Sequence, residues 1–192
     1  MTVAVGTGGT GAATGTIFID PTLSSAANQT FAANDPATAT SAITITNRGY
    51  LTTGTVISAA NELRVKVPAA FTMVWDTTDT SATITGGAAT KVYANGATQT
   101  TLCSASPCTA TVAYEDAGKT LVVYLGTDWA ASDTITIADL TFTSFTAGSA
   151  ADNLELEVLN DDVSQDEDDK TITITGASFI PRPSGAGYPA IY

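Results

Sequence analysis

Residues 61–68 read NELRVKVP, and their alternation decides the fold class. Leu63, Val65 and Val67 take every second position, and charged side chains occupy the positions between them. Successive side chains of a β-strand point to opposite faces, so this spacing predicts a strand with one buried face and one solvated face. The same period of two recurs at 43–46 (ITIT), 153–158 (NLELEV) and 171–175 (TITIT).

The rest of the chain repeats this alternation in short pieces separated by Gly, Asn, Asp and Pro. About ten such pieces, spaced about 8–15 residues apart, predict an all-β fold, an antiparallel β-sandwich with almost no helix. We expect three parts: an N-terminal arm at 1–20, the sandwich at 21–175, and an extended tail rich in Pro and Gly at 176–192. Trp75 and Trp129 lie next to predicted strands, and we interpret both as packing residues rather than platforms for a sugar.

The composition argues against several classes of function. The chain has 192 residues, with 7 Lys and Arg against 19 Asp and Glu, and a net charge of -12. This charge disfavours nucleic acid and anionic membranes as partners and leaves cations as the natural counterpart. Histidine is absent and no two carboxylates stand out as a hydrolytic pair, so we do not expect an enzyme. Because no apolar stretch reaches about eighteen residues, we also expect no membrane insertion.

The two cysteines, Cys103 and Cys108, lie in the run TLCSASPCTA. Strand-like residues flank a four-residue loop that contains Pro107, which favours a hairpin loop closed by a disulfide and hence an oxidising compartment. The alternative is a pair of free thiols.

An acidic run at 160–169, NDDVSQDEDD, lies between two predicted strands. Calcium binds six to eight oxygen ligands in flexible geometry, so a loop of this kind is a candidate calcium site, although its spacing is not that of an EF-hand. The alternative is a solvated loop that keeps the end of a strand soluble. The candidate ligands are Asn160, Asp161, Asp162, Asp166, Asp168 and Asp169, with Glu167 beside them. We expect no other cofactor.

The N-terminal arm, MTVAVGTGGTGAATGTIFID, contains two short apolar pieces in a run of Gly, Thr and Ala. Such a segment buries little apolar surface and loses much backbone entropy on ordering, so it needs a sheet edge to hold it. We expect the arm to add as a strand to the sheet of a neighbouring copy; the alternative is pairing within its own domain. The residues expected to make this contact are Val3, Ala4, Val5, Ile17, Phe18 and Ile19.

Between residues 27 and 175 the chain resembles a repeat module of large bacterial surface and adhesin-type proteins. Four phrases carry the resemblance: ANQTFAANDPATATSAITITN, AANELRVKVPAAFTMVWDTT, YEDAGKTLVVYLGTDWAASDTITIADLTF, and SAADNLELEVLNDD followed by DDKTITI. The resemblance implies an immunoglobulin-like sandwich used as an extracellular building block. The chain departs from the family in carrying one copy of the module between two terminal arms, like a donor-strand filament subunit.

Together these features predict a structural subunit of an extracellular filament, pilus-like or part of a biofilm matrix, that polymerises with itself by strand donation. The alternative is a cell-surface adhesin or a calcium-dependent carbohydrate-binding module. Asn28 begins the sequon Asn28-Gln29-Thr30, a candidate glycosylation site that also arises by chance in a Thr-rich chain.

Overall fold

The computed structural model describes residues 21–48, 57–159 and 163–176, and this part of the chain is all-β. It contains fourteen strands rather than about ten, with three short 3-10 turns: η1 (Ala89–Lys91), η2 (Gly96–Thr98) and η3 (Asp116–Gly118). The extra strands are short, and a two-residue strand such as β3 (Thr38–Ala39) or β6 (Val74–Trp75) cannot show a period of two.

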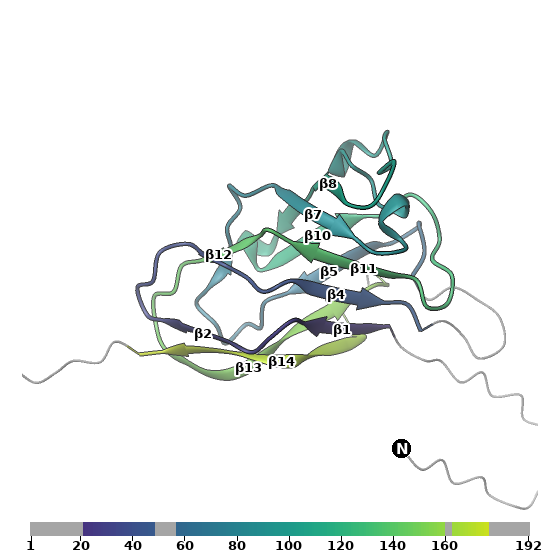
Figure 1. Cartoon of the computed structure of the whole chain (residues 1–192). Helices are drawn as coiled ribbons and strands as arrows, with labels where there is room; N and C mark the ends of the chain where they lie inside the picture. The colour runs from purple at the N-terminus through teal and green to yellow at the C-terminus, as the bar shows by residue number, and fades with distance from the viewer. Residues whose placement is uncertain (1–20, 49–56, 160–162, 177–192) are drawn as a thin grey trace, which may run out of the picture.

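The strands form three sheets, two large and one small (Figure 1). The five-stranded sheet has the order β1 (Thr22–Ser25), β4 (Ile43–Thr46), β11 (Thr134–Ala138), β7 (Ser81–Thr85) and β8 (Cys108–Thr111). The six-stranded sheet has the order β2 (Gln29–Ala32), β14 (Asp166–Thr175), β13 (Ser149–Glu157), β5 (Glu62–Lys66), β10 (Thr120–Tyr124) and β9 (Ala113–Glu115). In the small sheet, β12 (Thr141–Thr143) lies between β3 and β6.

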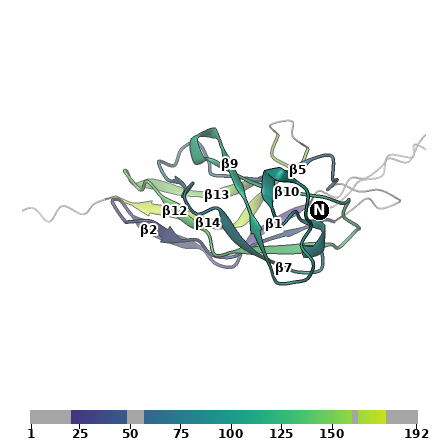
Figure 2. The same ribbon diagram turned by 90° about the horizontal axis from the view of Figure 1, so that it is seen from above.

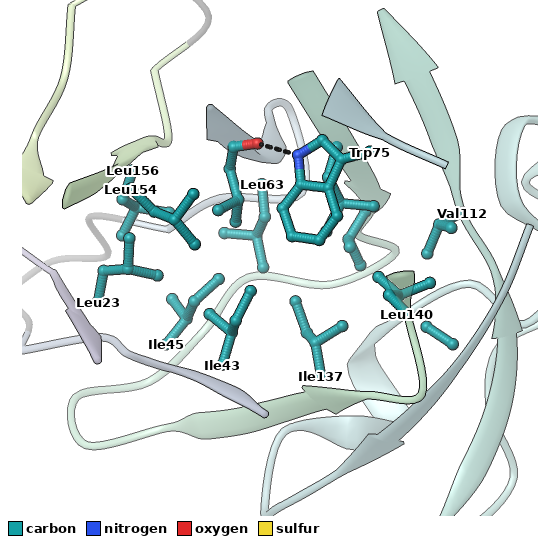
Figure 3. Close-up of a cluster of buried hydrophobic side chains, with 14 of the residues drawn as sticks. Leu23, Ile43, Ile45, Leu63, Trp75, Val112, Ile137, Leu140, Leu154 and Leu156 are labelled. Carbon is teal, nitrogen blue, oxygen red and sulfur yellow. Dashed lines mark hydrogen bonds between the residues drawn. The ribbon is translucent and has the colours of Figure 1, made fainter. Parts of the chain in front are cut away.

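The two large sheets bury one continuous apolar core between them, which makes the fold sandwich-like. Figure 3 shows Ile43, Ile45 and Ile137 of the five-stranded sheet pointing towards Leu63 and the neighbouring leucines of the six-stranded sheet. The alternation read from residues 61–68 is confirmed, because Leu63, Val65 and Val67 are all buried.

Trp75 and Trp129 are both fully buried, so neither offers an indole face to a sugar. The Trp75 Nε1–H donates to the backbone carbonyl of Val65 at 3.2 Å (Figure 3). This hydrogen bond offsets the desolvation of the Trp75 N–H on burial. The Trp75 ring packs on Phe142 at a centroid distance of 4.4 Å.

The segment from Thr22 to Ala32 switches between the two large sheets. Its first half, β1, pairs antiparallel with β4, and after a bend its second half, β2, pairs parallel with β14. The β2–β14 pair is the one parallel pairing among the described strands, a departure from the antiparallel sandwich that the sequence predicts. The period of two does not reveal strand direction, because it is the same in both cases.

The described chain begins and ends at opposite ends of an elongated body (Figures 1 and 2). Both halves of the switching segment run in the same direction as β14, so Pro21 lies near the start of β14 and Ala32 lies opposite Thr175 near its end. Gly148 approaches Gly176 so closely at this second end that a Cβ on Gly148 would lie 2.7 Å from the Gly176 nitrogen.

Candidate functional site

The start of β14 meets β1, and acidic side chains join the two strands. The carboxylate of Asp166 accepts a hydrogen bond from the Leu23 backbone N–H at 2.7 Å. Asp168 accepts one from the Ser25 N–H, also at 2.7 Å, and a second from the Ser25 hydroxyl. Two carboxylates of β14 that are two residues apart therefore accept from two backbone N–H groups of β1 that are also two residues apart. Both N–H groups point away from β4.

Asp168 is buried, with 2 % of its surface exposed, and it makes a third hydrogen bond to the Lys170 N–H at 3.0 Å. Asn153 of β13 holds the same stretch from the other side, donating through Nδ2 to the carbonyls of Asp168 and Lys170. A buried carboxylate with several donors around it is held firmly, and it leaves the exposed edge of β1 with fewer free amides.

Asp169, in contrast, is exposed and faces solvent. Its carboxylate accepts from the Ser24 hydroxyl at 2.7 Å and pairs with the Lys170 ammonium at 2.5 Å. The pKa of Asp169 is lowered, first by the hydrogen bond from Lys170 and then by the one from Ser24, since both favour the ionised form.

A small open pocket of about 390 Å³ lies over this junction. It is lined by side chains from both strands and by one cation, namely Thr22, Leu23, Ser24, Arg48, Asp166, Glu167 and Asp169. Its lining is mostly polar, and two of its carboxylates already hold β1.

The acidic run predicted as a calcium-binding loop is thus divided. Asp166, Glu167, Asp168 and Asp169 belong to strand β14 and not to a loop, and Asn160, Asp161 and Asp162 lie outside the described residues. Among the residues that the structure describes, no three His, Cys, Asp or Glu side chains form a group able to hold a metal ion. Calcium binding stays a prediction.

The β1 residues that these carboxylates bind were not predicted from the sequence. Leu23 and Ser25 precede their acidic partners by 143 residues, and nothing local marks them. The available signal is the matching spacing of two residues in 23–25 and in 166–168, which becomes informative only once β1 and β14 are known to lie side by side.

The predicted disulfide is present: Cys103 and Cys108 are bonded, with their Cα atoms 5.8 Å apart. Disulfides persist in oxidising compartments, so this bond is typical of a protein located outside the cytoplasm. In the described part of the chain, no helix is long and apolar enough to cross a membrane.

The remaining predicted sites have different outcomes. Asn28 is exposed, and its side-chain oxygen accepts from the Thr171 N–H at 3.0 Å, so the sequon lies at the surface where β2 begins. The residues expected to join neighbouring copies, namely Val3, Ala4, Val5, Ile17, Phe18 and Ile19, lie outside the described residues.

Comparison with family models, curated proteins and solved structures finds no match to this chain. The resemblance to an adhesin repeat module therefore remains an expectation from the sequence alone.

Proposed function

We propose that the chain is a structural subunit of an extracellular filament and that it polymerises by adding a terminal strand to a neighbouring copy. One observation carries this proposal: the described chain begins and ends at opposite ends of an elongated body.

The pairing along β14 gives this separation a scale. Asp166 at the start of β14 holds Leu23, two residues after Pro21 where the described chain begins, and Thr175 at the end of β14 pairs with Ala32. A strand advances about 3.3 Å per residue, so these two points lie about 30 Å apart along β14. The described chain therefore begins and ends at opposite ends, and a contact that joins one end of a copy to the other end of the next copy is head-to-tail. Such a contact produces an open filament where the rotation between successive copies does not close a ring.

The described body has an apolar core of its own. The buried apolar residues run from Leu23 to Ile174 and form one cluster, with both large sheets contributing. Because both large sheets contribute to this cluster, we expect a variant shortened at the N-terminus to stay folded, as a role for the arm between copies requires.

The finer architecture that we propose is an immunoglobulin-like sandwich. Two large sheets that share a core, and the buried tryptophan Trp75 at its centre, support this assignment. The Cys103–Cys108 disulfide supports an extracellular or cell-surface location for the filament.

The test compares the full chain with a variant that lacks residues 1–15, by electron microscopy and sedimentation. We expect thin uniform fibres from the full chain, and from the variant a folded monomer with an unchanged β circular-dichroism spectrum. A synthetic peptide of residues 1–19 should bind the shortened protein, whereas a peptide of the same composition in scrambled order should not. Fibres formed by the variant, or only compact monomers of the full chain, would contradict the proposal, and the second result would favour an adhesin or binding module.

A further inference from the structure

The outer face of the five-stranded sheet consists almost entirely of hydroxyl side chains. In each of its strands the buried positions alternate with outward ones, and every outward position except Ala138 is Ser or Thr. We call these residues the hydroxyl face: Thr22, Ser24, Thr44, Thr46, Ser81, Thr83, Thr85, Thr109, Thr111, Thr134 and Thr136.

The register of the strands places these hydroxyls in rows across the sheet. One row contains Thr22, Thr46 and Thr134, and the next contains Ser24, Thr44, Thr136 and Thr85. Within the rows, the hydroxyls of Thr44 and Thr136 lie 3.0 Å apart, and those of Thr46 and Thr134 lie 3.1 Å apart. These hydrogen bonds restrict the rotation of the four Thr side chains, so this part of the face is ordered.

The two outer faces of the body differ in charge. The outward positions of β5 in the six-stranded sheet are Glu62, Arg64 and Lys66, and Glu155 of β13 faces Glu167 of β14. No charged side chain occupies an outward position of the five strands that carry the hydroxyl face. A charged side chain, Asp169 of β14, lies at the edge of the hydroxyl face, where its carboxylate accepts a hydrogen bond from the Ser24 hydroxyl.

We propose that the hydroxyl face is a contact surface for a second copy of this chain, which joins neighbouring filaments side by side. This inference rests on the proposed function. Each copy carries a net charge of -12, and the charge-free hydroxyl face is a surface where two copies can meet without placing like charges directly opposite each other. A hydroxyl both donates and accepts, which makes an array of Ser and Thr complementary to itself across a two-fold axis.

The size of the face determines how strong this contact is. Five strands spaced about 4.8 Å apart, with outward residues over about 14 Å of each strand, present about 350 Å² per copy. Two such faces bury about 700 Å², which is below the roughly 1,200 Å² of a stable interface between two proteins. A single pair of copies should associate weakly, whereas filaments that align many pairs add these contacts and remain together.

The test uses single cysteines, because both native cysteines form a disulfide and leave no free thiol in the described chain. Thr136→Cys lies on the hydroxyl face, and Thr173→Cys is the matched control, a half-buried Thr in an equivalent Thr-Ile-Thr run of β14. The full-length variants are treated at high protein concentration with a short bis-maleimide. We expect at least tenfold more covalent dimer from Thr136→Cys than from the control. Adding Thr44→Lys to Thr136→Cys should reduce the dimer to the control level, because it places like charges opposite each other.

Electron microscopy of Thr44→Lys, without the added cysteine, completes the test. Circular dichroism checks that this variant folds, and Thr46→Glu replaces it if it does not. Bundles from the unmodified protein and single filaments from the variant support the inference. Equal cross-linking of the two cysteine variants overturns it, whether or not filaments form. Selective cross-linking of a protein that forms no filaments supports the surface but contradicts the proposed function. Retention on insoluble polysaccharide that Thr44→Lys abolishes, without selective cross-linking, overturns the inference in favour of a carbohydrate surface.

Discussion

Replacing Asp168 with Ala tests whether acidic side chains of β14 hold β1 in place. The substitution leaves the Ser25 N–H, the Ser25 hydroxyl and the Lys170 N–H without their acceptor, at a position where Asp168 is only 2 % exposed. A hydrogen bond to a charged group contributes about 1.5–3 kcal/mol, and contributions that share one acceptor do not add fully. We therefore expect the free energy of unfolding to fall by about 3–5 kcal/mol, a large part of the roughly 5–15 kcal/mol that a domain has.

The measurement is equilibrium unfolding in urea, followed by the fluorescence of the buried Trp75 and Trp129. The transition midpoint should fall while its slope stays the same, since the surface exposed on unfolding is unchanged. Asp168→Asn keeps one acceptor oxygen and should cost only about 1–2 kcal/mol. Asp169→Ala is the comparison on the same strand: because Asp169 is exposed and its partner on β1 is the Ser24 hydroxyl, its midpoint should fall much less than that of Asp168→Ala.

A double-mutant cycle isolates the pair itself. If Asp168 acts through Ser25, then Ser25→Ala should cost much less in the Asp168→Ala background than in the unmodified protein, with a coupling energy of about 1–2 kcal/mol. Equal unfolding midpoints for Asp168→Ala and Asp169→Ala, or additive effects of the two substitutions in the cycle, would show that Asp168 does not hold β1 through Ser25.

Three further predictions concern other parts of the molecule. Replacing Cys103 and Cys108 together with Ser should lower the free energy of unfolding by about 2 kcal/mol, the value for a short closed loop, and thermal unfolding with and without reductant measures it. The pKa of Asp76 is lowered by hydrogen bonds from the Thr78 hydroxyl and N–H, so its stabilising effect is fully present above the ordinary carboxyl pKa and is lost as pH falls through the lower folded value. Asp76→Asn should remove this part of the pH dependence of unfolding, and an unchanged pH profile would contradict the assignment. The calcium prediction for residues 160–169 requires that calcium raise the melting temperature and that a chelator reverse the change; identical melting curves would exclude it.

The fold class could be predicted because alternation is a local property. Residues 61–68 show the alternation without reference to any other part of the chain, because the buried and the more exposed side chains occur within one strand. β2 shows why the rest could not be predicted: Phe31 is its one buried residue, and its parallel pairing with β14 joins residues far apart in the chain. Strand direction and partner depend on these distant contacts, which a single sequence does not contain.

The same limit applied to the acidic run. Its composition identified carboxylates and made calcium a candidate ligand, with a solvated loop as the alternative, but composition does not show which donors surround a carboxylate. Asp168 has backbone and hydroxyl donors from Ser25 at the opposite end of the chain. The disulfide, by contrast, was predicted correctly, because Cys103 and Cys108 are separated by five residues and the loop between them is local.

β-Propensity accounts for the abundance of Thr in the strands, but not for the absence of charged side chains from one outer face. β-Propensity explains why Thr is common at solvated positions of strands, and it acts on both large sheets alike: Thr-Ile-Thr runs occur at 44–46 and 134–136 in one sheet and at 171–175 in the other. Propensity does not explain why Glu62, Arg64 and Lys66 occupy the outward positions of β5, while β4, β7 and β11 carry no charge at theirs. Solubility alone would favour charge on both faces. A sheet that excludes charge from one face, in a chain with a net charge of -12, is the arrangement expected where that face meets another copy.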